Sequence, residues 1–151
     1  MEVKQSNIPG AGMGLFTNGP IKKGDFIMKY EGTKVARGDD PTDGRYSYYV
    51  GNSVIIGANY ARFINDNVAF RKFTRAETVD FFHGRKLPRL ESPHNIAFVE
   101  NAEDETVDIV ATADINAGDE LLGDYGFGYW VPRVLRAGLT DHTYNIGHIR
   151  L

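Results

Sequence analysis

Short runs in which apolar and polar residues alternate, separated by turn residues rich in glycine, dominate the chain. This pattern is typical of β-strands and not of long amphipathic helices. It predicts strands at Leu15 to Thr17, Asp25 to Tyr30, Tyr46 to Val50, Val54 to Gly57, Ile96 to Val99, Val107 to Ala111 and Glu120 to Leu122. We therefore expect a mainly β fold with short helices.

One turn pattern occurs twice. The stretch from Ile21 to Ile27 resembles the stretch from Ile115 to Leu121. In each, an apolar residue enters a tight turn, a glycine supplies an unusual backbone angle, and an apolar strand follows. Two copies are too few for a solenoid, so we expect two similar corners of one β fold.

Residues 68–93 differ from the rest and are interpreted as an inserted helix and loop. Thr74 is suited to cap the helix and Glu77, three residues on, completes a capping box. Apolar bulk comes from Val79, Phe81 and Phe82. The segment is locally basic, a pattern most often found on a solvated face; its basic residues are Arg71, Lys72, Arg75, Arg85, Lys86 and Arg89. A second short helix is expected over 131–137, ending at Gly138.

Composition narrows the class of protein. The 151 residues are enough for one domain, expected over 1–138 with a tail over 139–151. The absence of cysteine excludes disulfides, cysteine zinc sites and a cysteine nucleophile. No apolar run is long enough to span a membrane. The net charge of −3 argues against direct nucleic-acid binding and favours a basic partner.

Several clusters are candidates for chemistry. The glycine-rich residues 10–14 precede a strand, which disfavours a dinucleotide fingerprint; they form either a plain turn or bare backbone that a ligand can approach. Residues 58–67 hold three asparagines, which suit either turns or a polar ligand. At period two Tyr46 and Tyr48 share a face, as core packing or as the wall of an alkylammonium channel. The four histidines lack metal spacing, so no metal is expected.

Tyr125 lies between Asp124 and Gly126 at the end of a predicted strand, where a core does not need it. We expect its hydroxyl to lie in an open site.

In their order, these pieces resemble the SET-domain family of protein lysine methyltransferases, in a small form without a cysteine-rich segment after the domain. The matching elements are Gly12 to Phe16, Ile21 to Asp25, Tyr30 to Gly32, Arg45 to Tyr48, Ala61 to Asn65, Ala113 to Leu121 and Asp124 to Gly126. The resemblance covers roughly Ile8 to Trp130. It implies a β-clip of small sheets with a threaded C-terminal segment, in which Tyr125 and Asn65 come together at one site.

The resemblance also implies an activity, which is S-adenosylmethionine-dependent methylation of a lysine in a basic protein segment, with a histone tail as the leading candidate. The implied catalytic residues are Tyr125, which aligns the reacting groups, and Tyr46, a channel wall. The implied cofactor contacts are Ala11, Gly12, Met13, Gly14, Arg62, Asn65, Asp66 and Trp130, the last as a stacking face for adenine. The implied substrate channel includes Tyr48, Gly123 and Phe127.

Two departures from the family pattern bear on activity. Asp66 stands where the family has histidine, and Gly123 where it often has an aromatic residue. Extra room at Gly123 predicts methylation beyond the first methyl group. The same departures support an alternative, a SET-like protein-binding module without catalysis. A nucleic-acid binder using the basic insertion is a weaker third class. We expect an intracellular protein, with the nucleus as one option, and leave a homodimer open.

Overall fold

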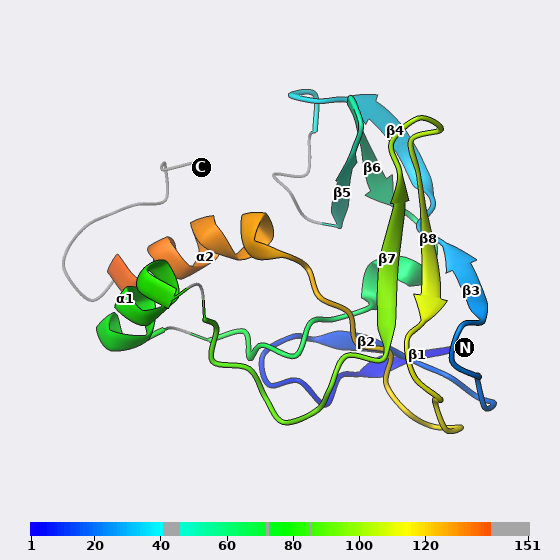
Figure 1. The fold of residues 1–151 in the computed structure, drawn as a ribbon, viewed down its shortest axis with the longest axis horizontal. Helices are drawn as coiled ribbons and strands as arrows, with labels where there is room; N and C mark the ends of the chain where they lie inside the picture. Colours follow the sequence, from blue (N-terminus) through cyan, green and yellow to red (C-terminus); the bar gives the residue numbers. More distant parts are fainter. Residues whose placement is uncertain (41–45, 72, 85, 140–151) are drawn as a thin grey trace.

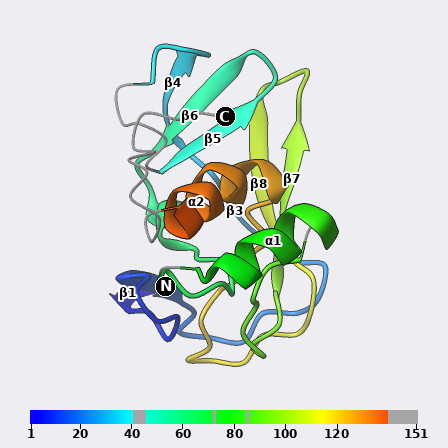
Figure 2. The same cartoon turned by 90° about the vertical axis from the view of Figure 1, so that its left-hand side faces the viewer.

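The computed structural model describes residues 1–40, 46–71, 73–84 and 86–139 (Figure 1). Its elements in chain order are β1 (Glu2–Gln5), β2 (Met13–Phe16), β3 (Phe26–Lys29), β4 (Gly32–Ala36), β5 (Ser47–Val50), β6 (Ser53–Gly57), the 3-10 helix η1 (Tyr60–Phe63), α1 (Arg75–Gly84), β7 (Ile96–Asn101), β8 (Thr106–Ala111) and α2 (Phe127–Leu139). The strands form small antiparallel sheets in the orders β1-β2, β3-β8-β7 and β4-β6-β5. Figures 1 and 2 show α1 and α2 side by side, apart from these sheets. The expected class, mainly β with short helices, is confirmed.

The central strand β8 shows why alternation predicted the sheets. Val107, Ile109 and Ala111 are buried in the main core, whereas the residues between them are half-buried. On the second face Asp108 pairs with Lys29 of β3 at 2.7 Å. Period-two burial of this kind places one face of the strand on the core.

Six of the seven expected strands form, with ends shifted by one or two residues. The seventh, Glu120 to Leu122, is not a strand, because its residues pair singly with different segments: Glu120 bridges to Phe16, and Leu122 bridges to Asn65. The sequence analysis missed β1 and β4, whose mostly exposed residues give no apolar alternation.

The two repeated corners face each other. Ile21 and Ile115 form a reciprocal antiparallel bridge, with N···O distances of 2.9 and 2.8 Å. The turn glycines Gly24 and Gly118 both have left-handed backbones, with φ of 91° and 89°. The repeated sequence therefore builds one paired feature, as two similar corners of a single β fold.

Two apolar cores are present. The larger is formed by the sheets and η1, around Leu15, Ile109 and Leu121. The smaller belongs to the insertion and α2, and its buried members are Val68, Phe73, Phe81, Trp130 and Val134. The insertion is therefore packed against the C-terminal helix and is not a loosely attached loop.

The expected helix of the insertion is present as α1. The amide of Glu77 donates to Thr74 Oγ1 at 3.1 Å, and the amide of Thr74 donates to Glu77 Oε1 at 2.9 Å, which is the expected capping box. Phe81 is buried, whereas Val79 and Phe82 are exposed. Only part of the predicted apolar bulk therefore enters the core.

The second helix begins earlier than expected. It starts at Phe127 and ends at Leu139, so Pro132 lies inside it and Gly138 does not terminate it. Its start follows Gly126, whose φ is 87°. Trp130 and Val134, one turn apart, are both buried and anchor the early turns, which local sequence signals did not reveal.

Some expectations lie outside the described residues, namely those for Arg45, Lys72, Arg85 and the tail from residue 140 onwards. Within the described ranges, no helix combines the length and apolar character needed to cross a bilayer.

The capping box of α1 gives a stability prediction. Thr74→Ala removes the acceptor for the Glu77 amide and should lower the free energy of unfolding by about 1 kcal/mol. Thr74→Ser keeps the oxygen and should stay close to the wild type. Urea denaturation of the three proteins measures both values, and an equal loss in the two variants would exclude the cap as the cause.

Candidate active site

The site is built where the C-terminal segment crosses two earlier ones. The amide of Gly123 donates to the carbonyl of Asn65 at 2.9 Å. On the other flank, the Asn95 side chain donates to the carbonyl of Glu120 at 2.9 Å and accepts from the amide of Leu122 at 2.8 Å. Residues 120–123 are therefore held between Asn65 and Asn95, which delivers Tyr125 to the neighbourhood of Asn65.

Tyr125 is fixed through its hydroxyl. The hydroxyl donates to the carbonyl of Ile64 at 2.5 Å and lies 3.4 Å from Asn65 Oδ1. The structure thus brings Tyr125 and Asn65 together as expected, and the Tyr125 residue is half-buried. Burial, followed by the neighbouring Tyr129 and Asp66, raises the pKa of Tyr125 well above its usual value. The group is consequently a neutral phenol that can orient atoms but cannot serve as a base at physiological pH.

A connected series of aromatic rings leads away from Tyr125. Its ring lies 6.5 Å from Phe98, Phe98 lies 5.5 Å from Tyr48, and Tyr48 lies 5.6 Å from Tyr30. The Tyr48 hydroxyl donates to Glu100 at 2.9 Å. These rings form an apolar wall next to Tyr125, with Tyr48 in it as expected.

Tyr30 belongs to this wall and was not among the predicted site residues. It is buried, its hydroxyl donates to the carbonyl of Tyr46 at 2.5 Å, and burial raises its pKa. A Cβ on Gly57 would lie only 2.7 Å from that hydroxyl, so Gly57 makes room for it. The sequence signal that could have identified it is a tyrosine at the end of a predicted strand, directly before Glu31 and Gly32. This Tyr-Glu-Gly element was interpreted only as part of a strand.

Tyr46 lies apart from Tyr48. Its backbone is left-handed, with φ of 59°, and precedes β5, so the strand alternation does not reach it. Its ring neighbours are Phe63 and the guanidinium of Arg62, whereas those of Tyr48 are Tyr30 and Phe98. The expectation that Tyr46 and Tyr48 act as one face is therefore wrong.

One end of the predicted cofactor site is open. No atom lies within 4 Å of where a Cβ on Gly12 would stand, and Met13 is 47% exposed. Ala11 is half-buried in the turn before them. The Asn65 side chain donates to the carbonyl of Met13 at 2.9 Å and holds this backbone in place. Arg62 Nε is buried and has no hydrogen-bond partner among the described residues.

The missing side chain of Gly14 leaves room for a carboxylate of the protein. A Cβ there would lie 2.4 Å from Glu120 Oε2. That carboxylate accepts from the Ser6 hydroxyl at 2.6 Å and from the Asn7 amide at 2.8 Å. The absence of a side chain at Gly14 thus admits a buried carboxylate of the protein itself, and not a ligand.

Asp66 is completely buried and makes no open surface for a cofactor. Its Oδ1 accepts from the Asn67 amide at 2.7 Å and from Arg89 Nη1 and His94 Nε2, each at 2.6 Å. Its Oδ2 accepts from the Tyr125 amide at 3.1 Å and from Trp130 Nε1 at 2.8 Å. Since a carboxylate only accepts hydrogen bonds, His94 carries its proton on Nε2.

The charge of Asp66 is retained inside the protein. Burial would raise its pKa, but hydrogen bonds from His94, Trp130 and the Tyr125 amide, with the charge of Arg89, outweigh burial and lower the pKa below its usual value. The family resemblance implies a cofactor contact at Asp66, whereas all of its hydrogen bonds in this structure are to other residues of the protein.

Trp130 is 1% exposed and cannot offer a free face to adenine in this structure. Tyr125 stacks on it at 6.1 Å and 17°, and Phe70 packs against it at 5.4 Å. The expected role as a stacking lid is therefore not supported by the packing. Tyr129 packs edge-on against both Tyr125 and Trp130 and belongs to the same cluster.

The two remaining channel candidates are also corrected. A Cβ on Gly123 would lie 2.5 Å from Ile96 Cδ1 and 2.7 Å from Phe98 Cε2, so the expected room at Gly123 is already filled. Phe127 is 42% exposed and stacks on Phe81 at 5.1 Å, which places it at the contact between α1 and α2.

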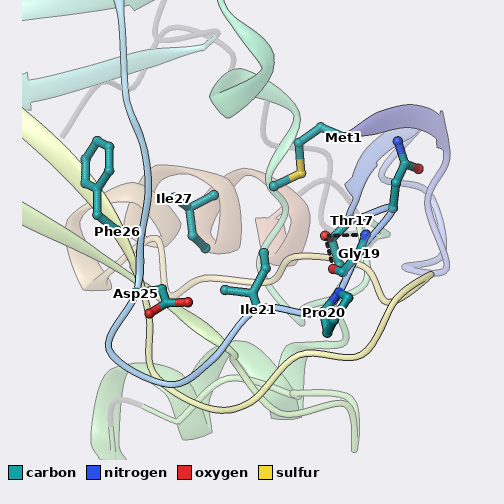
Figure 3. A pocket seen from close by; sticks show the side chains of 9 residues that line it. Met1, Thr17, Gly19, Pro20, Ile21, Asp25, Phe26 and Ile27 are labelled. Carbon is teal, nitrogen blue, oxygen red and sulfur yellow. Dashed lines mark hydrogen bonds between the residues drawn. The ribbon is translucent and has the colours of Figure 1, made fainter.

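Two shallow hollows lie elsewhere on the surface. The one in Figure 3, about 320 Å³, is lined by Met1, residues 17–21 and residues 25–27. The other, about 410 Å³, follows the end of α1. Neither includes a predicted site residue. Among the described residues, no group of three or more histidines and carboxylates is placed to hold a metal ion.

Comparison with known proteins now identifies the class. The SET-domain family model matches residues 12–126, and the chain belongs to the SET-domain family. Members of this family are generally protein lysine methyltransferases that use S-adenosylmethionine. No curated protein matches the chain.

A solved structure shares the fold. The crystal structure of a Plasmodium falciparum protein, described as a candidate histone methyltransferase, superposes with a TM-score of 0.56 and 19% sequence identity. The match covers 85% of this chain and 95% of that one. At this identity the likeness concerns the fold alone.

The buried Asp66 gives a pH prediction. Because its pKa is lower in the folded than in the unfolded state, its stabilising contribution is complete above the usual carboxyl pKa of about 3.9 and is lost as pH falls below that value. Asp66→Asn should lower the free energy of unfolding at pH 7 by about 3–5 kcal/mol and flatten this acid dependence.

The matched control is Asp108→Asn, which removes a paired carboxylate whose side chain is 40% exposed and should cost less than about 1 kcal/mol. Urea unfolding between pH 3 and 7 measures both, in buffers spaced about one unit apart around the reference pKa. Similar losses of unfolding free energy in the two variants would contradict the role of Asp66 as a buried junction between segments.

Proposed function

We propose that this protein is an S-adenosylmethionine-dependent protein lysine N-methyltransferase. The observation that carries the proposal is the neutral Tyr125 hydroxyl, held by the Ile64 carbonyl next to Asn65 and flanked by an aromatic wall. Such a group suits a reaction that needs alignment and exclusion of water more than a base. Membership of the SET-domain family supports the same activity.

The residues at the glycine turn fit the cofactor at its methionine end. When bound, S-adenosylmethionine would supply a methyl group on a cationic sulfur: a neutral amine would form a bond to the methyl carbon as the carbon–sulfur bond breaks, and the neutral thioether S-adenosylhomocysteine would leave. Gly12 and Met13 are exposed in the described part of the chain, and Asn65 fixes this backbone through the Met13 carbonyl. Arg62, whose Nε has no hydrogen-bond partner among the described residues, is the proposed donor to the carboxylate of the cofactor. Asp66 and Trp130 act behind this surface and do not form it.

Tyr125 then has an orienting role. Its proton is used by the Ile64 carbonyl, which leaves the hydroxyl oxygen to accept weak hydrogen bonds from polarised C–H groups. Tyr48 and Phe98 keep water away from the approach. A lysine amine entering this apolar passage arrives neutral, because desolvation lowers its pKa.

The proposed substrate is a basic protein segment, with a histone tail as the leading candidate. The exposed hairpin between β7 and β8 carries Glu103 and Asp104, and Glu100 lies beside the Tyr48 hydroxyl. Together with the net charge of −3, these carboxylates would attract basic residues around the target lysine.

A second candidate function is protein binding without catalysis. It is favoured by the closed packing of Trp130 under Tyr125 and Phe70, which leaves no stacking face for an adenine. Binding of a lysine-containing segment with no measurable affinity for S-adenosylmethionine would support this candidate over the enzyme.

The central test is Tyr125→Phe. The variant keeps the ring and loses the hydroxyl, so we expect kcat to fall at least about a hundredfold while the dissociation constant for S-adenosylmethionine changes less than about threefold. Turnover on a lysine-rich peptide and calorimetry measure the two quantities. Tyr129→Phe is the control, since it removes a hydroxyl from the same cluster and should retain most activity. Unchanged turnover in Tyr125→Phe would refute the assigned role.

The packing around Gly123 reverses the expectation on the number of methyl groups. Because Ile96 and Phe98 fill the space, the wild type should stop after the first methyl. Phe98→Ala opens that space and should increase di- and trimethylated product. Val99→Ala, which shortens the exposed neighbouring side chain, should not. Mass spectrometry of peptides at long reaction times decides, and multiple methylation by the wild type would contradict this account.

A further inference from the structure

Arg89 of the insertion is the centre of a polar cluster that reaches the candidate site. Its Nη1 donates to Asp66 Oδ1 at 2.6 Å and to Asn67 Oδ1 at 2.7 Å, and its Nη2 lies 3.3 Å from Asp124 Oδ1. These partners come from two separate segments, residues 66–67 and the residue just before Tyr125. The Arg89 guanidinium therefore connects the insertion both to residues 66–67 and to Asp124, the residue before Tyr125.

The carboxylate of Asp66 continues this connection to Tyr125. One oxygen accepts from Arg89 and His94, and the other accepts from the Tyr125 amide and the Trp130 indole. A planar carboxylate cannot rotate at one oxygen without moving the other. The position of Arg89 is therefore transmitted to the backbone of Tyr125 across a single side chain.

The insertion is also anchored by hydrogen bonds that the guanidinium does not donate. The Leu90 amide donates to the Asn67 carbonyl at 2.8 Å, and the Asn67 side chain donates to the Ser92 carbonyl at 2.8 Å. Val68 and Arg89 also form a backbone bridge. Loss of the Arg89 side chain should thus disturb the orientation of Asp66 without detaching the segment.

We propose that Arg89 is a positioning residue, which acts through Asp66 to hold Tyr125 and Trp130 in place and makes the insertion part of the active-site machinery. This inference rests on the proposed methyltransferase function for its kinetic consequence. Arginine is suited to the task because it stays charged at every physiological pH and its planar fork reaches several acceptors at once. His94 touches the same Asp66 oxygen but has only one nitrogen there.

The experiment compares Arg89→Met with Arg75→Met. Both remove one charge from the insertion, but Arg75 is exposed on α1. We expect Arg89→Met to lower kcat about ten- to a hundredfold, as small misplacements of catalytic groups do, with the KM for S-adenosylmethionine within about twofold of the wild type. Arg75→Met should match the wild type in both. Arg89→Lys should recover part of kcat, since it keeps the charge on Asp66 but not the fork.

A second readout does not depend on activity. The chain has one tryptophan, so its indole N–H gives a single NMR signal that reports on the bond to Asp66. We expect that proton to exchange with solvent several-fold faster in Arg89→Met than in Arg75→Met, with both proteins folded at the assay temperature.

The outcomes separate the two claims. An active wild type with equal kcat in the two methionine variants, or a kcat loss accompanied by an equal rise in KM, would overturn the positioning role. Unaltered indole exchange in Arg89→Met would overturn it as well, whether or not the enzyme turns over. An inactive wild type with faster indole exchange would refute the proposed function and leave the structural connection standing.

Discussion

The structure depends on one buried carboxylate. Asp66 is completely removed from solvent, and an isolated charge at such a depth would cost several kcal/mol. It is stable there because five donors reach its two oxygens: the Asn67 amide, Arg89 of the insertion, His94 just after the insertion, the Tyr125 amide and Trp130 of α2. None of these segments can move far without leaving a buried charge unpaired. The hydrogen bonds of Asp66 therefore fix the relative positions of the segments that form the candidate site.

Residues 120–123 are held between Asn65 and Asn95, and this crossing fixes the path of the chain that leads to Tyr125. The segment makes a few isolated hydrogen bonds, to the Asn65 carbonyl on one side and to the Asn95 side chain on the other. Because it is not part of a regular strand ladder, it cannot shift by one residue and keep these bonds. Close approaches then explain the small residues nearby. Gly14 admits the Glu120 carboxylate, and Gly123 admits Phe98. The glycines that had suggested a ligand site thus divide into those that face the protein and Gly12, which faces open space.

The sequence predicted the features that depend on neighbouring residues and missed those that depend on contacts between distant segments. Six strands, the Thr74 capping box and the two similar corners at Ile21 and Ile115 were predictable, because alternation and turn chemistry act within a few residues. That the two corners pair with each other was not predicted. The meeting of Tyr125 with Asn65 followed from the family resemblance. The role of Asp66 was not predictable, because its partners lie up to 64 residues away and no local pattern records them. Trp130 and Gly123 were misjudged for the same reason, since their neighbours come from Phe70 and Phe98.

The central claim is that this site transfers a methyl group to a lysine amine. The most direct measurement is to incubate the wild-type protein with S-adenosylmethionine carrying a labelled methyl group and a histone-tail peptide, and to locate the label by fragmentation mass spectrometry. A matched peptide in which every lysine is replaced by arginine tests the acceptor. The account predicts label on lysine Nζ of the first peptide and none on the second. Label on arginine, or no label although S-adenosylmethionine is shown to bind, would contradict it.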